Sequence, residues 1–140
     1  MPYDPTLVQP MRDELTRLGV AELRTASAVE TFLAERSGSA LLVFNSVCGC
    51  AAGAARPAVA LALRQPGGPD RVASVFAGQD VEATARARAA LPDCPPSSPS
   101  FALLRDGALV HFVPRHRIEG LPADRVAADL VAAFARHLQP

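Results

Sequence analysis

The apolar run at residues 40–44 restricts the fold of this chain more than any other feature. Its five residues are all hydrophobic, and turn-forming residues bound it. Such a run is typical of a strand buried on both faces, as in a parallel sheet covered by helices. Cys48-Gly49-Cys50 follows at once, before an Ala-rich helical pattern at 51–63. The cysteines are therefore predicted to lie at the carboxyl end of a central strand, where open α/β sheets carry functional residues.

The rest of the chain alternates between helical and strand patterns, and we expect one domain over residues 1–140. Five helices are predicted: one at 5–18, one that begins after a cap at Thr25 or Ser27, and three at 51–63, 81–91 and 122–138. Strands are predicted at 20–24, 40–44, 71–76, 101–104 and 109–113. Pro10 predicts a kink or a late start in its helix, Pro57 predicts a bend, and Asp80 is the expected cap of the fourth helix. This order predicts an α/β fold with a central mixed sheet, flanked by helices and preceded by an extra N-terminal helix.

Charge and hydropathy exclude some classes of function. The chain has 14 basic and 14 acidic residues, which argues against a sequence-independent nucleic-acid binder. The N-terminus has no signal-peptide pattern, and the longest apolar run is too short to span a membrane. We therefore expect a cytoplasmic protein without a membrane or nucleic-acid partner. In that reducing compartment the three cysteines are expected to be redox-active, metal-binding or inert rather than structural.

The Cys48-Gly49-Cys50 motif carries the strongest chemical signal. The N-terminus of a helix stabilises a thiolate, which is the reactive form of cysteine. Gly49 is expected to let the backbone bend, and a disulfide between such close cysteines is expected to be easily reduced. Cys48 precedes the helix and is expected to be the more exposed, attacking sulfur, with Cys50 resolving the mixed disulfide. Two alternatives are a pair of buried structural cysteines and a metal site.

The metal alternative lacks the usual ligand spacing. Zinc sites generally contain four ligands in closely spaced pairs. The other candidate ligands are Cys94, His111, His116 and His137, and they show no paired spacing. We therefore predict no metal site, and we interpret Cys94 as a loop thiol outside the chemistry.

Three further residues are candidates for substrate contacts. Pro99 follows Ser98 and stands two residues before the hairpin strand, where a thioredoxin-like fold has a cis-proline facing the active cysteines. The alternative is an ordinary proline-rich turn. Arg115 follows the hairpin and is a candidate to bind a carboxylate of a small thiol, the alternative being a solvated connection. Arg56 is interpreted as a structural or supporting residue.

Four blocks of the sequence resemble the bacilliredoxin signature. They are Asn45-Ser46-Val47-Cys48-Gly49-Cys50-Ala51-Ala52-Gly53 with Ala55-Arg56-Pro57-Ala58, Val75-Phe76-Ala77-Gly78-Gln79-Asp80, Pro96-Ser97-Ser98-Pro99-Ser100, and His111-Phe112-Val113-Pro114-Arg115-His116. The similarity extends from about Pro10 to about His137. The resemblance implies a thioredoxin-like fold that uses Cys-Gly-Cys where thioredoxins use two cysteines separated by two residues.

The resemblance also implies an activity and the residues that perform it. Members of this family remove the small thiol bacillithiol from mixed disulfides on proteins. By position, Cys48 would be the nucleophile, Cys50 the resolving cysteine and Pro99 the cis-proline, with Gly49, Ser98 and Arg115 as substrate contacts. Bacillithiol would act as a co-substrate with no bound cofactor. The expected partners are bacillithiolated client proteins and a cellular disulfide reductant. The alternatives are a general disulfide isomerase or oxidase and a non-enzymatic metal-binding or thiol-sensing module.

Overall fold

The apolar run at 40–44 forms the centre of β2 (Ser39–Asn45), the middle strand of a five-stranded sheet. In the computed structural model, which describes residues 2–139, the strand order is β1-β3-β2-β4-β5. β2 pairs in parallel with β3 and antiparallel with β4, and all seven of its residues are buried. The predicted mixed sheet is therefore confirmed.

The other predicted elements are also present, with ends that differ by a few residues. The helices are α1 (Pro5–Thr16), α2 (Ala26–Ala34), α3 (Arg56–Leu63), α4 (Val81–Ala89) and α5 (Ala123–His137), and the remaining strands are β1 (Ala21–Glu22), β3 (Arg71–Phe76), β4 (Ser100–Arg105) and β5 (Ala108–Val113). A π-helical turn, η1 (Ala51–Ala55), precedes α3, and a short 3-10 helix, η2 (Arg115–Arg117), precedes α5. None of the helices within residues 2–139 is long and apolar enough to cross a membrane.

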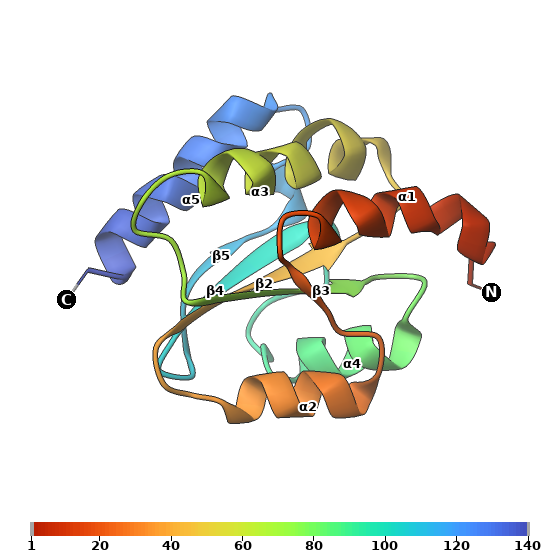
Figure 1. Cartoon of the computed structure of the whole chain (residues 1–140), viewed down its shortest axis with the longest axis horizontal. Helices are drawn as coiled ribbons and strands as arrows, with labels where there is room; N and C mark the ends of the chain where they lie inside the picture. Colours follow the sequence, from red (N-terminus) through yellow and green to blue (C-terminus); the bar gives the residue numbers. More distant parts are fainter. Residues whose placement is uncertain (1, 140) are drawn as a thin grey trace.

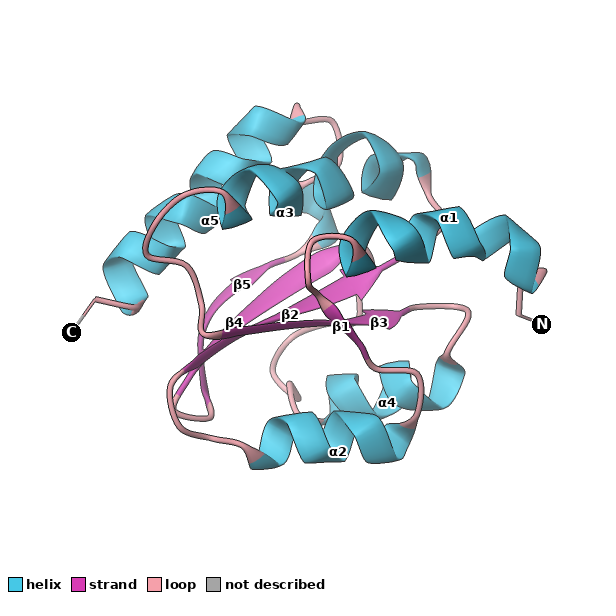
Figure 2. Ribbon diagram, in the orientation of Figure 1, coloured by secondary structure: helices cyan, strands magenta, loops and turns pink. Residues whose placement is uncertain are grey.

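Helices cover both faces of the sheet. Figures 1 and 2 show α1, α3 and α5 on one face and α2 and α4 on the other. Alternate residues of β2 point to opposite faces, as the period of a strand requires. Leu41 and Val43 join the core beneath α3 and α5, whereas Leu42 and Phe44 join the core beneath α2 and α4. Two hydrophobic layers therefore hold the central strand in place.

Two of the predicted helices contain a proline, and the local structure around the two prolines differs. α1 begins at Pro5 and runs through Pro10, so the predicted late start is wrong. Pro57 lies in the first turn of α3, directly after the π-helical turn η1, in which the Arg56 N–H donates to the Ala51 carbonyl. Pro57 has no N–H and its ring would crowd a carbonyl of the preceding turn, so a wider turn accommodates it. The bend predicted at Pro57 stays a prediction, and the structure shows a change of helix type just before this residue.

Asp80 occupies the N-cap position of α4, but its carboxylate caps no backbone N–H. It instead accepts two hydrogen bonds from the Arg12 guanidinium, with N–O distances of 2.7 and 3.0 Å. Arg12 is 2 % exposed, lies over the Phe76 ring and also faces Glu22 at 3.4 Å. This buried pair attaches α1 to the loop after β3. The capping interaction predicted for Asp80 is therefore wrong, because a bidentate partner from α1 occupies the carboxylate.

Replacing Arg12 tests how much this attachment stabilises the fold. Arg12→Met leaves the mostly buried Asp80 carboxylate unpaired, so we expect a loss of about 3–5 kcal/mol in the free energy of unfolding. The control is Arg24→Met, which removes an exposed Arg24–Glu22 pair at 3.6 Å and should cost less than about 1 kcal/mol. Urea unfolding followed by circular dichroism measures both. Equal losses of unfolding free energy in the two variants would show that the buried Arg12–Asp80 pair does not stabilise the packing of α1.

Candidate active site

Cys48 and Cys50 lie in the loop that leaves the end of β2 and begins the next helix. The Cys48 carbonyl accepts hydrogen bonds from the N–H groups of Ala51 and Ala52 at 3.1 and 3.3 Å. The first helical turn therefore starts at Cys48 and leads through η1 into α3. The predicted position of both cysteines, at the start of the helix that contains Pro57, is confirmed.

Gly49, between the two cysteines, is exposed. It does not have the positive φ that would favour glycine, and an added Cβ would meet no atom within 4 Å. The backbone freedom expected of Gly49 is therefore not used. The lack of a side chain instead leaves the solvent side of the loop open between the two sulfur atoms.

The two sulfur atoms are neighbours. Both cysteines are free thiols, and their Sγ atoms are 2.7 Å apart. Each side chain is half-buried, so the expected contrast between an exposed Cys48 and a covered Cys50 is not seen. The two cysteines differ instead in acidity.

Hydrogen bonds separate the pKa values of the two thiols. Burial acts to raise the pKa of Cys48, but hydrogen bonds from the Cys50 and Ser46 side chains and from backbone N–H groups outweigh it and lower the pKa. Burial raises the pKa of Cys50, as do its hydrogen bond to Cys48 and the charge on that sulfur; Arg115 acts in the opposite direction. The Cys48 thiolate therefore forms at lower pH than the Cys50 thiolate.

The Ser98–Pro99 peptide bond is cis, as predicted. Ser100 pairs with Phe44 across β4 and β2, so this register places Pro99 beside the end of β2 from which the cysteine loop leaves. Pro99 is buried. The proline loop and the cysteine loop therefore share one edge of the sheet.

Arg115 joins the same edge from η2. Its Nη1 donates to the Ser98 carbonyl at 3.4 Å, and its Nε and Nη2 contact the Glu119 carboxylate at 3.0 and 2.9 Å. The pKa of Arg115 is raised first by Glu119 and then by the charges of Cys50 and Cys48. The guanidinium is therefore close enough to the cysteine pair to interact with both sulfur atoms, while remaining accessible to solvent.

A cavity of about 470 Å³ adjoins this edge. Its walls come from the proline loop, β5 and η2, and its lining residues are Asp93, Cys94, Pro95, Pro96, Ser97, Phe112, Pro114, Arg115, His116 and Glu119. Cys94 is half-buried here, and burial together with Asp93 raises its pKa. The cavity therefore offers an apolar surface with charged groups at its border.

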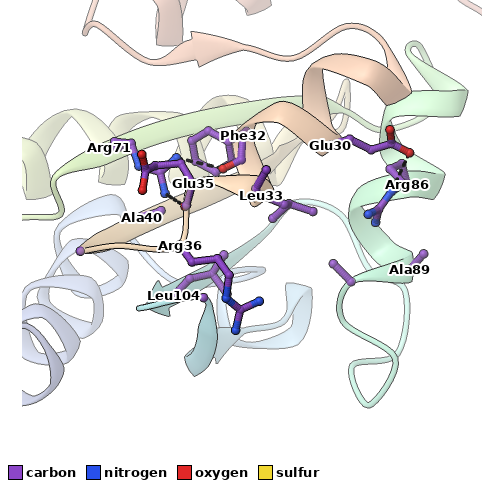
Figure 3. A pocket seen from close by; sticks show the side chains of 14 residues that line it. Glu30, Phe32, Leu33, Glu35, Arg36, Ala40, Arg71, Arg86, Ala89 and Leu104 are labelled. Carbon is purple, nitrogen blue, oxygen red and sulfur yellow. Dashed lines mark hydrogen bonds and ion pairs between the residues drawn. The ribbon is translucent and has the colours of Figure 1, made fainter.

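A second cavity of similar size, about 490 Å³, lies at the opposite end of the sheet. Figure 3 shows Glu30, Phe32, Arg71 and Arg86 around it, with Ala40 from the start of β2. The cysteine loop leaves the other end of that strand. This second cavity is therefore separate from the cysteine pair.

The residues that sequence analysis considered as metal ligands do not come together. No group of three or more His, Cys, Asp or Glu side chains within residues 2–139 is arranged to hold a metal ion. His111 contacts Asp129 at 3.2 Å on the side of the sheet that faces α5, and Cys94 lines the cavity described above.

Sequence analysis gave no role to Asn45 and Ser46, which precede the cysteines, and interpreted Arg56, which follows them, as a structural or supporting residue. Asn45 Oδ1 accepts a hydrogen bond from the Ser46 N–H at 2.9 Å, and Ser46 Oγ accepts one from the Cys48 N–H at 3.1 Å. The buried Arg56 donates to Asn45 Oδ1 and to the Ser46 carbonyl, both at 2.9 Å. The sequence signal for a role at the site was Arg56 itself, an arginine in an otherwise apolar helical segment directly after the cysteine motif.

Known proteins are similar to this chain in sequence and in fold. A family model described as disulphide isomerase matches residues 3–138. A bacilliredoxin of Shouchella clausii is 50 % identical over 98 % of this chain and 94 % of its own length, and a bacilliredoxin of Symbiobacterium thermophilum is 58 % identical over 89 % of each chain. Among solved structures, Fasciola hepatica thioredoxin has a TM-score of 0.59 at 24 % identity, covering 84 % of this chain and 99 % of its own. A Malassezia sympodialis thioredoxin has a TM-score of 0.54 at 18 % identity, covering 86 % and 91 %. The thioredoxin-like fold is therefore confirmed.

The pH dependence of alkylation tests the order of the two pKa values. In the reduced protein we expect Cys48 to react with iodoacetamide at lower pH than Cys50, because a thiol with a lowered pKa is deprotonated first as the pH rises. Cys94 is the internal control and should react only at higher pH. Initial rates at each cysteine are read by peptide mass spectrometry. A lower midpoint at Cys50 than at Cys48 would contradict this assignment.

Proposed function

Because the chain belongs to the bacilliredoxin family and is a thiol–disulfide oxidoreductase, we propose that it removes bacillithiol from protein mixed disulfides through Cys48 and Cys50. The observation that carries the proposal is the pair of neighbouring thiols with opposite pKa shifts at the start of a helix. An acidic thiol supplies the attacking thiolate, and an adjacent, less acidic thiol completes the exchange.

The first step transfers bacillithiol to the enzyme. The Cys48 thiolate attacks the bacillithiol sulfur of the client's mixed disulfide, forming a bond between Cys48 Sγ and bacillithiol. The bond between the client cysteine and bacillithiol breaks, and the client cysteine leaves as a thiolate that takes a proton from water. The lowered pKa of Cys48 supports its role in this step, because more of the thiol is in the reactive form.

The second step releases bacillithiol. Cys50 loses its proton and attacks Cys48 Sγ, which forms the Cys48–Cys50 disulfide and expels bacillithiol as a thiolate that is then protonated. The two electrons that reduce the client's mixed disulfide come from the pair of cysteines. A cellular disulfide reductant then returns the Cys48–Cys50 disulfide to two thiols. The 2.7 Å separation of the sulfur atoms supports direct resolution by Cys50.

The bound small thiol is proposed to lie between the cysteine loop and the cavity beside it. Arg115 stands at the border of that cavity and interacts with both cysteines, so it is placed to bind a carboxylate of the small thiol. Ser98 and Pro99 lie beside the end of β2 from which the cysteine loop leaves, and a side chain added at Gly49 would meet open space. The client protein would approach from that open side.

We propose that the protein works in the cytoplasm. Its partners would be bacillithiolated client proteins and the recycling reductant in the cytoplasm, with bacillithiol as a co-substrate and no bound cofactor. A second candidate is disulfide isomerisation, which the description of the matching family model favours. An isomerase would rearrange disulfides in a scrambled protein without consuming a reductant, whereas the proposed reaction consumes one pair of electrons for each bacillithiol released.

Single cysteine variants test the two roles. Cys50→Ser should accumulate a stable Cys48–bacillithiol adduct when exposed to oxidised bacillithiol, because resolution is blocked. Cys48→Ser should form no such adduct at the motif, because the remaining Cys50 thiol is still subject to burial, which raises its pKa, and lacks the Ser46 hydrogen bond that lowers the pKa of Cys48. Intact mass with peptide mapping reads out both variants. An adduct on Cys48→Ser alone would reverse the roles, and labelling only at Cys94 would remove the motif from the reaction.

Replacing Arg115 tests the contact with the small thiol. In the Cys50→Ser background, Arg115→Ala should slow adduct formation with oxidised bacillithiol about tenfold, because a charge-assisted hydrogen bond is lost. Reaction with a neutral aromatic disulfide should change much less, which separates recognition from any effect on sulfur reactivity. Arg117→Ala is the matched control, since this exposed arginine pairs with Asp129 instead. Equal slowing with both reagents, or with both variants, would contradict a binding role for Arg115.

A further inference from the structure

Arg56 is a buried cation that connects the two sides of the cysteine loop. The residue is 3 % exposed and lies at the start of α3, after the motif. Its Nη1 donates to Asn45 Oδ1 and to the Ser46 carbonyl, both before the motif and both at 2.9 Å. A buried guanidinium is costly unless it is paired and hydrogen-bonded, so these contacts restrict where the Asn45–Ser46 segment can lie.

Ser46 carries this restriction to Cys48. Its Oγ accepts a hydrogen bond from the Cys48 N–H at 3.1 Å, which leaves the hydroxyl proton for another acceptor. Burial acts to raise the pKa of Cys48, and the Ser46 side chain is among the hydrogen-bonding groups that lower it. The Ser46 hydroxyl therefore lies against the Cys48 main chain, where its proton can point toward the Cys48 sulfur as long as the Ser46 main chain stays in place.

The N-terminal helix fixes the other side of Arg56. Glu14 Oε2 lies 3.2 Å from Arg56 Nε, and the Met11 carbonyl accepts a hydrogen bond from Asn45 Nδ2 at 3.3 Å. α1 therefore contacts both the guanidinium and the asparagine that the guanidinium binds. The support beneath the cysteine loop contains residues from α1, from the end of β2 and from α3.

We propose that Arg56 is a positioning residue for Cys48: it holds the Asn45–Ser46 main chain so that the Ser46 hydroxyl faces the Cys48 sulfur. The inference rests on the proposed function, in which Cys48 is the attacking sulfur. Arg56 acts through Ser46, and Glu14 and Met11 hold the geometry from α1. Removing Arg56 should therefore change the acidity of Cys48 only while the Ser46 hydroxyl is present.

Two other ionisable groups face Cys48 besides the Glu14–Arg56 pair. Cys50 is the adjacent thiol, and Arg115 interacts with both sulfur atoms from η2. A Cys50→Ser background removes the first titration from the measurement. Arg115 is unchanged across the variants, so its contribution is the same in every comparison.

The test measures the midpoint of Cys48 alkylation by iodoacetamide against pH in the Cys50→Ser background. Ser46→Ala and Arg56→Met should each raise the midpoint by about one pH unit, because each removes the same stabilisation of the thiolate. The double variant should show no larger shift than Ser46→Ala alone. Arg86→Met is the control: it removes an exposed ion pair with Glu30 between α4 and α2, on the face of the sheet opposite α3, and it should leave the midpoint unchanged.

Arg56→Lys provides the same test if Arg56→Met does not fold. A lysine keeps the charge but cannot hold one donor against the Asn45 and Ser46 oxygens while a second nitrogen stays beside Glu14, so it should raise the midpoint by a smaller amount, and only when Ser46 is present. Additive shifts for Ser46 and Arg56, or no shift in a folded Arg56 variant, would overturn the proposal. The midpoint needs no bacillithiol, so a missing adduct on Cys50→Ser would count against the proposed function and not against the positioning role.

Discussion

The structure depends on a central strand that is buried along its whole length and ends in a polar residue. Asn45 closes β2 with its main chain and side chain inside the protein, where unpaired polar groups are costly. Its carbonyl accepts from the Ala77 N–H, and its side-chain oxygen accepts from Ser46 and Arg56. These hydrogen bonds turn the chain out of the core at a defined place. The cysteine loop therefore begins from a rigid position.

The chemistry of the site arises from small differences between two similar thiols. Both cysteines are half-buried, and burial alone would make both less acidic. Cys48 has the hydrogen-bond donors of Ser46 and the helix start, whereas Cys50 faces the sulfur of Cys48. Arg115 adds a positive charge from a different part of the chain. These contacts give the two thiols different acidities.

The sequence was sufficient for the architecture because hydrophobic periodicity determines which faces are buried. The continuous run of β2 and the helical stripes predicted the layers, and the cis bond of Pro99 was predicted from its place before the hairpin together with the resemblance to thioredoxin-like proteins. The π-helical turn could not be foreseen, since its wider hydrogen bonding has no residue signature beyond Pro57. The Arg12–Asp80 pair joins residues 68 positions apart, so its geometry was also inaccessible. That both cysteines are half-buried depends on side-chain packing, which the spacing of residues in the sequence does not report.

The central claim is that Cys48 and Cys50 reduce the mixed disulfide between a client protein and bacillithiol, and are themselves oxidised to a disulfide. The most direct measurement is the amount of free bacillithiol released from a bacillithiolated client by reduced enzyme without a recycling reductant, together with the disulfide formed on the enzyme. The account predicts equal amounts of released bacillithiol and Cys48–Cys50 disulfide, with Cys94 remaining a free thiol. Release without a Cys48–Cys50 disulfide, or a disulfide formed through Cys94, would contradict it.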